Sequence, residues 1–114
     1  MKTSLAELLA HIPGAPSKKW PEGERYAEGF SHGSMSIGLY APLGRDPQTP
    51  HLQDELYIVH SGTAAITISG NEQPCAPGDA FFVAAGVEHR FHGMSADFRA
   101  WVVFWGPKGG EPSA

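Results

Sequence analysis

The chain has 114 residues, of which 18% are charged, and its formal net charge is −4 when the histidines are neutral. This length suits one domain with a modest core rather than two domains. The acidic balance argues against a nucleic-acid-binding protein, because such proteins cluster lysines and arginines on one face and the one basic doublet here is Lys18-Lys19.

The single cysteine, Cys75, excludes an internal disulfide framework and a cysteine-based zinc finger, and it suits a reducing, cytoplasmic location. No apolar run approaches the roughly 18 residues of a membrane helix. The first residues lack a charged start followed by a long apolar core, so we expect no signal peptide. These features predict a cytoplasmic protein that does not enter a membrane.

The N-terminal residues predict one short helix. Ser4-Leu5-Ala6-Glu7 has the form of a capping box, in which the serine and glutamate side chains bind free amides at the start of a helix. Three leucines and Ile12 then form an apolar stripe. We expect an amphipathic helix from about Ser4 to His11, ended by Pro13-Gly14. Residues 1–23 would comprise this helix and a proline-rich connector.

Short apolar or alternating runs, separated by turns rich in glycine and proline, predict about nine β-strands. The segments that we assign as strands are 24–31, 34–41, 54–61, 63–69, 73–76, 80–83, 87–92 and 98–105. Gly70-Asn71 predicts a hairpin tip. Because no long crossover helix joins the strands, we predict an all-β barrel or double-sheet jelly roll over residues 24–106. A flexible tail, 107–114, would follow.

The last predicted strand, Phe98 to Trp105, is apolar on both faces, and Leu56 and Ile58 point away from the expected interior. A strand covered on both sides implies a second layer or a partner. We therefore expect a homodimer.

A metal site is predicted around residue 53. If residues 49–62 form a strand, His51, Gln53 and Glu55 share one face, because side chains alternate between the two sides. Burial of a carboxylate costs several kcal/mol unless something neutralises it, and a divalent metal does so with these groups as ligands. His89 supplies a second imidazole from another strand-like run.

Six aromatic residues are candidates for the wall of a ligand pocket, which would then be apolar and suited to a ring. They are Tyr40, Tyr57, Phe81, Phe91, Trp101 and Phe104. Tyr57 shares the inward face with Glu55, and its hydroxyl needs a partner when buried, so it is also a candidate catalytic or positioning residue. The alternative for all six is a place in the hydrophobic core.

The residues before Gly62 resemble the first motif of the cupin family. That motif has a glycine, a spacer, His-x-His, three or four residues, Glu, six residues and a second glycine. Glu55 and Gly62 have the separation of its end, His51 takes the place of the second histidine, and Thr49 that of the first. The chain departs from the pattern at this one ligand, and Gln53 is the residue that could replace the missing donor.

A later segment resembles the second cupin motif, which runs from a glycine through Pro-x-Gly and His to Asn. Gly78, Gly86 and His89 match it in order and spacing. Ala84 stands in place of the proline and Gly93 in place of the asparagine. These two changes leave the histidine ligand intact.

This resemblance covers roughly residues 44–93. It implies a single-domain cupin-type β-barrel, or double-stranded jelly roll, with a divalent transition metal held by His51, Glu55 and His89 and with Gln53 as a candidate fourth ligand. Two histidines and one carboxylate suit Fe(II), whereas Mn, Ni, Co, Cu or Zn could occupy a similar set. It also implies a homodimer.

For function, we expect a metal-dependent, dioxygenase-like oxidoreductase that acts on a small molecule. Two alternatives remain open: a metal-dependent isomerase or lyase, and a non-enzymatic module that binds or senses a small ligand.

Overall fold

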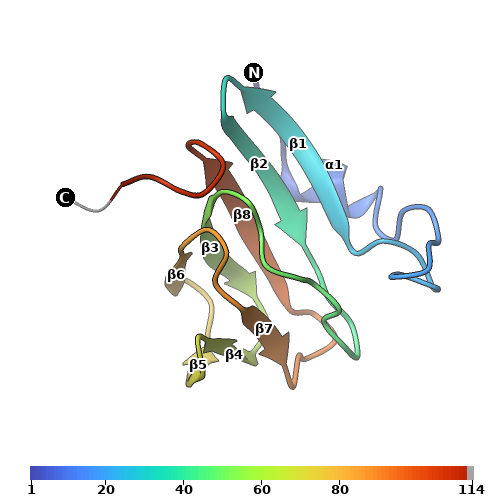
Figure 1. Cartoon of the computed structure of the whole chain (residues 1–114). Coiled ribbons are helices and arrows are strands. Elements are labelled where there is room, and N and C mark those ends of the chain that lie inside the picture. Colours follow the sequence, from blue (N-terminus) through green and yellow to red (C-terminus); the bar gives the residue numbers. More distant parts are fainter. Residues whose placement is uncertain (113–114) are drawn as a thin grey trace.

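The computed structural model describes residues 1–112 and contains two antiparallel β-sheets and one short helix, α1 (Leu5–Leu9) (Figure 1). The strands are β1 (Tyr26–His32), β2 (Met35–Tyr40), β3 (Asp54–Ser61), β4 (Ala64–Ile68), β5 (Asn71–Cys75), β6 (Ala80–Val83), β7 (His89–His92) and β8 (Arg99–Trp105). The larger sheet has the order β1-β2-β8-β3-β6 and the smaller one β5-β4-β7. The chain therefore changes sheet repeatedly, and the predicted all-β double-sheet fold with an N-terminal helix is confirmed.

The predicted strands recur with small shifts at their ends. β3 and β6 have the predicted bounds, whereas β7 begins two residues later than predicted. Eight strands occur in residues 1–112, against about nine expected. The hairpin tip between β4 and β5 is Ser69-Gly70, with φ of 49° and 84°, because a two-residue turn of this kind needs positive φ at both central residues. Asn71 already belongs to β5.

α1 begins as predicted. The Ser4 hydroxyl accepts a hydrogen bond from the Glu7 amide at 3.2 Å, which is the serine half of a capping box. The helix packs against β1 and β2, and Leu8 is its buried residue. Within residues 1–112, no helix is both long enough and apolar enough to cross a membrane.

The hydrophobic core lies between the two sheets. Tyr57 and Val59 of β3 and Val102 of β8 meet Ile66 and Phe91 of the smaller sheet. Side chains two apart share a face, so each strand lends its alternate residues to this layer. The core fills the space around the C-terminal half of β3, and a pocket remains at the end where β3 begins and β8 ends.

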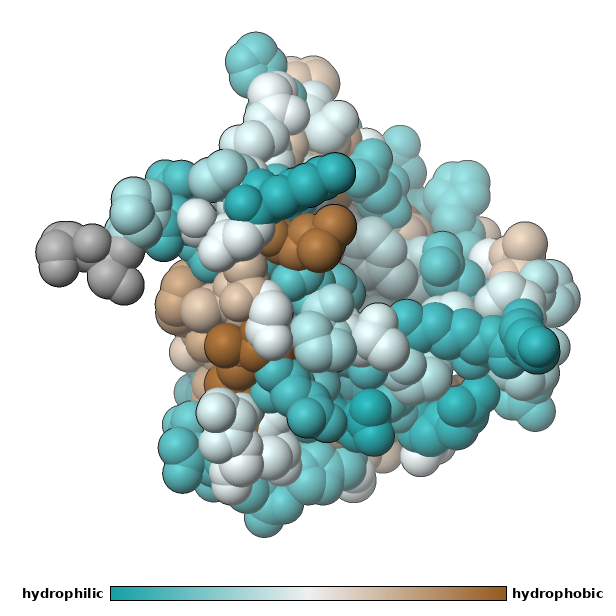
Figure 2. All heavy atoms as spheres, in the orientation of Figure 1, coloured by the Kyte–Doolittle hydropathy of each residue, from teal (hydrophilic) through white to brown (hydrophobic). Residues whose placement is uncertain are grey.

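The outer face of the larger sheet is apolar as well. Leu56 lies opposite Phe82 and Val103 on the neighbouring strands, and Ile58 lies opposite Trp101, so the five side chains share this face. Phe82 is 55% exposed and Ile58 39%. Figure 2 shows apolar side chains gathered over β6. The outward direction predicted for Leu56 and Ile58 is confirmed.

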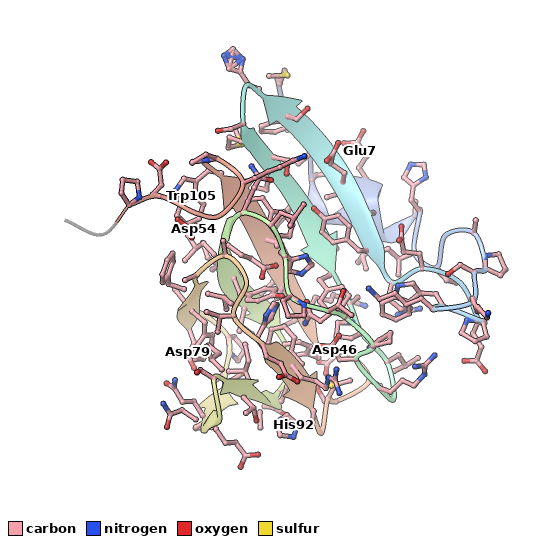
Figure 3. The ribbon with its side chains drawn as sticks, in the orientation of Figure 1. Glu7, Asp46, Asp54, Asp79, His92 and Trp105 are labelled. Atoms are coloured by element: carbon pink, nitrogen blue, oxygen red, sulfur yellow. The ribbon has the colours of Figure 1, made fainter. Side chains whose placement is uncertain are left out.

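The residues after β8 return to the start of β3. Asp54 lies opposite Trp105, and Figure 3 shows both at the end where the C-terminal segment leaves the sheet. The Gly109 amide donates to the Leu52 carbonyl at 2.8 Å, and the Glu111 amide donates to Asp54 Oδ2 at 3.0 Å. Residues 109–111 thus lie against the start of β3. Residues 113–114 of the predicted tail lie outside the described residues.

Candidate metal centre

The structure brings His51, Glu55 and His89 together. Each offers one ligand atom, and these atoms all lie within 4.8 Å of one another. His89 Nε2 is 3.0 Å from Glu55 Oε1, and His51 Nε2 is 3.8 Å from Glu55 Oε2. The three residues come from the loop before β3, from β3 and from β7, so both sheets contribute to the cluster.

Strand alternation aims two of these residues inward. Glu55 and His89 are buried, whereas their chain neighbours Leu56 and Arg90 are more exposed. His51 precedes β3 and lies in irregular chain. The Gly86 amide donates to the His51 carbonyl at 2.8 Å, which ties the loop before β3 to the turn before β7.

Glu55 is a buried carboxylate with an unsatisfied oxygen. It is 1% exposed, and its ion-pair contacts among residues 1–112 are both with histidines. Among the described residues, its Oε1 atom has no hydrogen-bond donor. A buried charge of this kind is costly unless a cation or a proton compensates it.

The His89 ring is oriented by the backbone. Its Nδ1 lies 2.9 Å from the Val87 carbonyl, which only accepts, so Nδ1 carries the proton of the neutral ring. Nε2 then presents a lone pair to the Glu55 carboxylate. An imidazole held through its other nitrogen in this way is typical of a metal ligand.

The two histidines differ in their tendency to accept a proton. Burial lowers the pKa of His51 and outweighs the opposing effect of Glu55, which favours the neutral, metal-binding ring. For His89, burial also lowers the pKa. The adjacent Glu55 carboxylate, together with the Val87 carbonyl, raises the pKa by more than burial lowers it, so the net shift is upward. A proton and a metal ion therefore compete for His89 Nε2.

Two separations between histidine nitrogens and Glu55 oxygens are compatible with ligands on a single metal ion. Two ligand atoms, each about 2.1 Å from a metal, lie about 3.0 Å apart at a right angle and about 3.4 Å apart at the tetrahedral angle. The observed separation of 3.0 Å from His89 Nε2 to Glu55 Oε1 matches the first value, and 3.8 Å from His51 Nε2 to Glu55 Oε2 is slightly wider than the second. A cation among these atoms would also satisfy Glu55 Oε1.

Gln53 does not belong to this cluster, which corrects the prediction that it is a fourth ligand. Its side-chain amide donates to the carbonyls of Ser34 and Gly106, each at 2.9 Å. The prediction extended strand alternation back to His51, but β3 begins at Asp54. Alternation does not hold in the irregular residues before it.

Gln48, which the sequence patterns did not identify, lies at the cluster instead. Its Oε1 is 3.2 Å from His51 Nε2 and 3.1 Å from His89 Nε2, and it accepts a hydrogen bond from the Tyr57 hydroxyl at 2.9 Å. Gln48 is buried, whereas Thr49, which takes the place of the first histidine in the motif, is exposed. Pro47 and Pro50 flank this segment, and neither predicts the direction of the Gln48 side chain.

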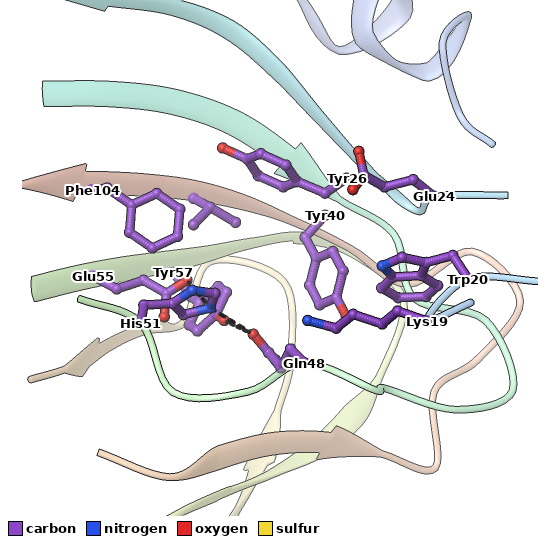
Figure 4. Close-up of a pocket in the computed structure, with 11 residues that line it drawn as sticks. Lys19, Trp20, Glu24, Tyr26, Tyr40, Gln48, His51, Glu55, Tyr57 and Phe104 are labelled. Atoms are coloured by element: carbon purple, nitrogen blue, oxygen red, sulfur yellow. Dashed lines mark hydrogen bonds and ion pairs between the residues drawn. The ribbon is translucent and has the colours of Figure 1, made fainter. Parts of the chain in front are cut away.

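His51 and Glu55 of this cluster, together with Gln48, line a pocket of about 270 Å³ (Figure 4). Of the six predicted wall residues, three line it: Tyr40, Tyr57 and Phe104. Four further lining residues come from the connector and from β1 or just before it, where no motif pointed to a site: Lys19, Trp20, Glu24 and Tyr26. The Tyr26 hydroxyl is buried without a hydrogen-bond partner among the described residues.

The other three predicted wall residues lie elsewhere, which corrects that part of the prediction. Phe91 packs in the core against Tyr57, with ring centroids 4.8 Å apart, and Phe81 packs against the same core. Trp101 lies on the outer face of the larger sheet, because alternation along β8 turns Val102 inward in its place.

Residues 37–105 of the chain match the family model described as Cupin domain. A similar protein, an uncharacterized protein from Streptomyces coelicolor, is 46% identical over 85 residues, which cover 73% of this chain and 81% of that protein.

Solved structures share the fold. Protein NMB1881 from Neisseria meningitidis has a TM-score of 0.67 and 18% identity, with 93% of this chain and 100% of that chain covered. KdgF from Halomonas sp. has a TM-score of 0.63 and 16% identity, with 70% and 76% covered. A Cupin 2 conserved barrel domain protein from Salinispora arenicola has a TM-score of 0.60 and 18% identity, with 71% and 74% covered. At such identities the likeness concerns the fold alone.

Proposed function

Because the chain belongs to the cupin domain family, and because it gathers two histidines around a buried carboxylate, we propose that it is a metal-dependent enzyme. Its metal ligands would be His51, Glu55 and His89, and its reaction a dioxygenase-like oxidation of a small molecule. The observation that carries this proposal is Glu55, a buried carboxylate whose ion-pair contacts in residues 1–112 are two histidines.

A divalent transition metal in this set would supply a Lewis acid with coordination positions left open. We propose Fe(II), since two histidines and one carboxylate with open positions suit it. Mn, Ni, Co, Cu and Zn are the competing metals, and analysis of the purified protein separates them.

Tyr57 is the residue that we propose positions the reacting molecule. Its hydroxyl lies 3.1 Å from His89 Nε2, and Tyr57 lines the pocket. Burial, followed by the charge of Glu55, raises the pKa of Tyr57 well above its ordinary value, so the hydroxyl keeps its proton. Tyr57 is therefore a hydrogen-bond donor rather than a base. Its acceptor in the structure is Gln48 Oε1, at 2.9 Å, and Tyr57 would donate to the reacting molecule in place of Gln48.

For the substrate we propose a compact, ring-bearing molecule with a negative charge, which would lie nearer to Lys19 than to Glu24. The pocket volume of about 270 Å³ lies below that of pockets for drug-sized ligands. Tyr40, Phe104 and Trp20 supply aromatic wall surface. Lys19 extends along the pocket toward Gln48 (Figure 4), so its ammonium group is placed to meet an anionic group. We propose small cyclic or aromatic carboxylates as the first compounds to test.

The first test is the metal content of protein purified without an affinity tag, for the native chain and for His51→Ala and His89→Ala. We expect near-stoichiometric transition metal in the native protein and its loss in both variants. Oxygen uptake with small carboxylates then tests the reaction. Metal without oxygen uptake would favour the isomerase or lyase, or the binding module. No metal bound after addition of Fe, Mn, Ni, Co, Cu or Zn would refute a metalloenzyme.

We also propose that the chain forms a homodimer through the outer face of the larger sheet. The support is the exposed apolar surface around Ile58 and Phe82, because burial of such a surface against a partner is favourable. Ile58→Asp and Phe82→Asp should produce a monomer in light scattering at micromolar concentration. Leu43→Asp is the matched control, because Leu43 is 52% exposed but lies in the loop after β2. A monomeric native protein would refute the proposal.

A cytoplasmic location is proposed as well, supported by one buried cysteine that has no intramolecular disulfide partner. Fractionation of the producing cells would test it, and recovery from a secreted or membrane fraction would contradict it.

A further inference from the structure

Gln48 is held in one orientation by a buried carboxylate. Its side-chain Nε2 donates to Asp46 Oδ2, and its backbone amide donates to Asp46 Oδ1 at 3.1 Å. Because an ionised carboxylate only accepts hydrogen bonds, the NH₂ end of the Gln48 amide must face Asp46. The carbonyl end, Oε1, must then face His51 and His89. The orientation thus follows from the chemistry of the contact.

Asp46 is itself firmly placed. It is 4% exposed, accepts a hydrogen bond from the Tyr40 hydroxyl and accepts another from the Phe91 amide at 2.8 Å. Phe91 lies in β7, two residues after His89, and Figure 3 shows Asp46 in the loop before β3, beside β7. Asp46 therefore ties the segment that carries Gln48 to the strand that carries a metal-ligand histidine.

Gln48 Oε1 lies close to two of the three predicted ligands, His51 and His89. A carbonyl oxygen has two lone pairs, and the Tyr57 hydroxyl occupies one of them at 2.9 Å. The other faces His51 Nε2 at 3.2 Å and His89 Nε2 at 3.1 Å. These separations lie between the right-angle value of about 3.0 Å and the tetrahedral value of about 3.4 Å for ligands on one metal.

With the neutral His89 tautomer, His89 Nε2 presents a lone pair to two oxygen atoms. His89 Nε2 faces Gln48 Oε1 and Glu55 Oε1, and neither oxygen can donate. A cation in their midst removes the repulsion. The Asp46 carboxylate also strengthens Gln48 as a ligand, because its negative charge on the NH₂ end polarises the amide toward Oε1.

From these contacts we propose that Gln48 is the fourth protein ligand of the metal centre and that Asp46 is its positioning residue. The proposal rests on the proposed metal-binding function of His51, Glu55 and His89. It deepens that function by assigning two oxygen and two nitrogen donors to the metal, with Gln48 in place of the histidine that the chain lacks.

The test uses Co(II) as the probe, because its visible absorption bands report the number and kind of its ligands. We expect Gln48→Leu to weaken Co(II) affinity by about 10- to 100-fold and to shift these bands. Gln48→His offers a nitrogen donor from the same position and should restore affinity with a spectrum of its own. Gln53→Leu, which alters a nearby amide that bonds Ser34 and Gly106, should change neither.

Asp46→Asn tests the positioning role. It should lower Co(II) affinity by about tenfold and move the Co(II) bands, since the polarising charge on the amide is lost. A purely structural role would lower the unfolding temperature but leave the spectrum of the folded protein unchanged, and that result would overturn the assignment of Asp46.

Failure of this inference is distinguishable from failure of the proposed function. If His89→Ala abolishes Co(II) binding while Gln48→Leu keeps the native affinity and spectrum, the three-ligand centre stands and Gln48 is not a ligand. If the native protein binds no Co(II), both proposals are wrong. If Gln48→Leu does not fold, Gln48→His decides: a spectrum identical to the native one overturns the proposal, and a shifted one supports it.

Discussion

The two faces of β3 carry opposite chemistry, and neither follows the usual distribution of residues. The inner face presents Glu55 and Tyr57 in full burial, whereas the outer face presents Leu56 and the partly exposed Ile58. Folded chains usually bury apolar side chains and expose charged ones. The buried Glu55 carboxylate has no lysine or arginine partner in residues 1–112, and it supports our proposal of a metal centre. The exposed apolar residues of the other face support our proposal of a homodimer.

The largest effect that we predict concerns the hydrophobic core, which packs against the inner face of β3. Phe91→Ala should lower the free energy of unfolding by about 3–5 kcal/mol, because it empties a fully buried ring position. Phe82→Ala, on the exposed outer face, should change it by less than about 0.5 kcal/mol when measured in monomer. Urea unfolding measures both. Equal losses would mean that Phe91 is not part of the core.

Charge on the inner face should decide metal binding. Glu55→Gln keeps the shape of the side chain but removes its charge, so we expect metal affinity to fall by at least about 100-fold, which is about 2.7 kcal/mol. The matched control is His60→Gln, since His60 lies on the same strand but is exposed. Competition with a chelator measures both affinities. If the two variants lost metal affinity to a similar extent, the inner face of β3 would not be the metal-binding face.

Removal of the metal should destabilise the native protein but not the Glu55→Gln variant. At a free metal concentration about 100 times the Kd, binding stabilises the fold by about 2.7 kcal/mol. Excess chelator should therefore lower the Tm by roughly 10 °C for a chain of this size. Differential scanning calorimetry tests this. The same decrease in the variant would show that the chelator acts elsewhere.

The smallest effect concerns Cys75, the last residue of β5, whose thiol is kept neutral by burial. Burial raises the pKa of Cys75 to about 11. At pH 8 only about one thiol in 1,000 is then ionised, so iodoacetamide should modify the native protein slowly, and about ten times faster per pH unit toward pH 11. The protein unfolded in urea is the control. Rapid modification of the native protein at pH 8 would contradict a raised pKa.

The sign of the linked stability effect follows from the same shift. Folding raises the pKa of Cys75 above its ordinary value of 9.0, so the folded state prefers the protonated thiol. The unfolded chain loses this proton first as the pH increases. The contribution of Cys75 to stability is therefore constant below about pH 9 and decreases from there to about pH 11.

Local patterns were sufficient for the strands. β3 and β6 have the predicted bounds because alternation, and the turn residues that end a strand, act over a few neighbouring residues. The same rule placed Glu55 and His89 inside and Leu56 outside. It failed at Gln53, where the chain is not yet a strand. At Trp101 the rule held, and the prediction was wrong because it assigned Trp101 and Phe104, of opposite parity, to the same pocket.

The sequence by itself thus determined the all-β fold, the inward direction of Glu55 and His89, and the presence of His51 near them. Only the tertiary structure decided that Gln48, rather than Gln53, joins these residues. The irregular segment before β3 has no period to predict its direction. Its conformation depends instead on contacts such as that of Asp46 with the Phe91 amide, which join residues 45 positions apart, and no pattern of neighbouring residues encodes a contact of that range.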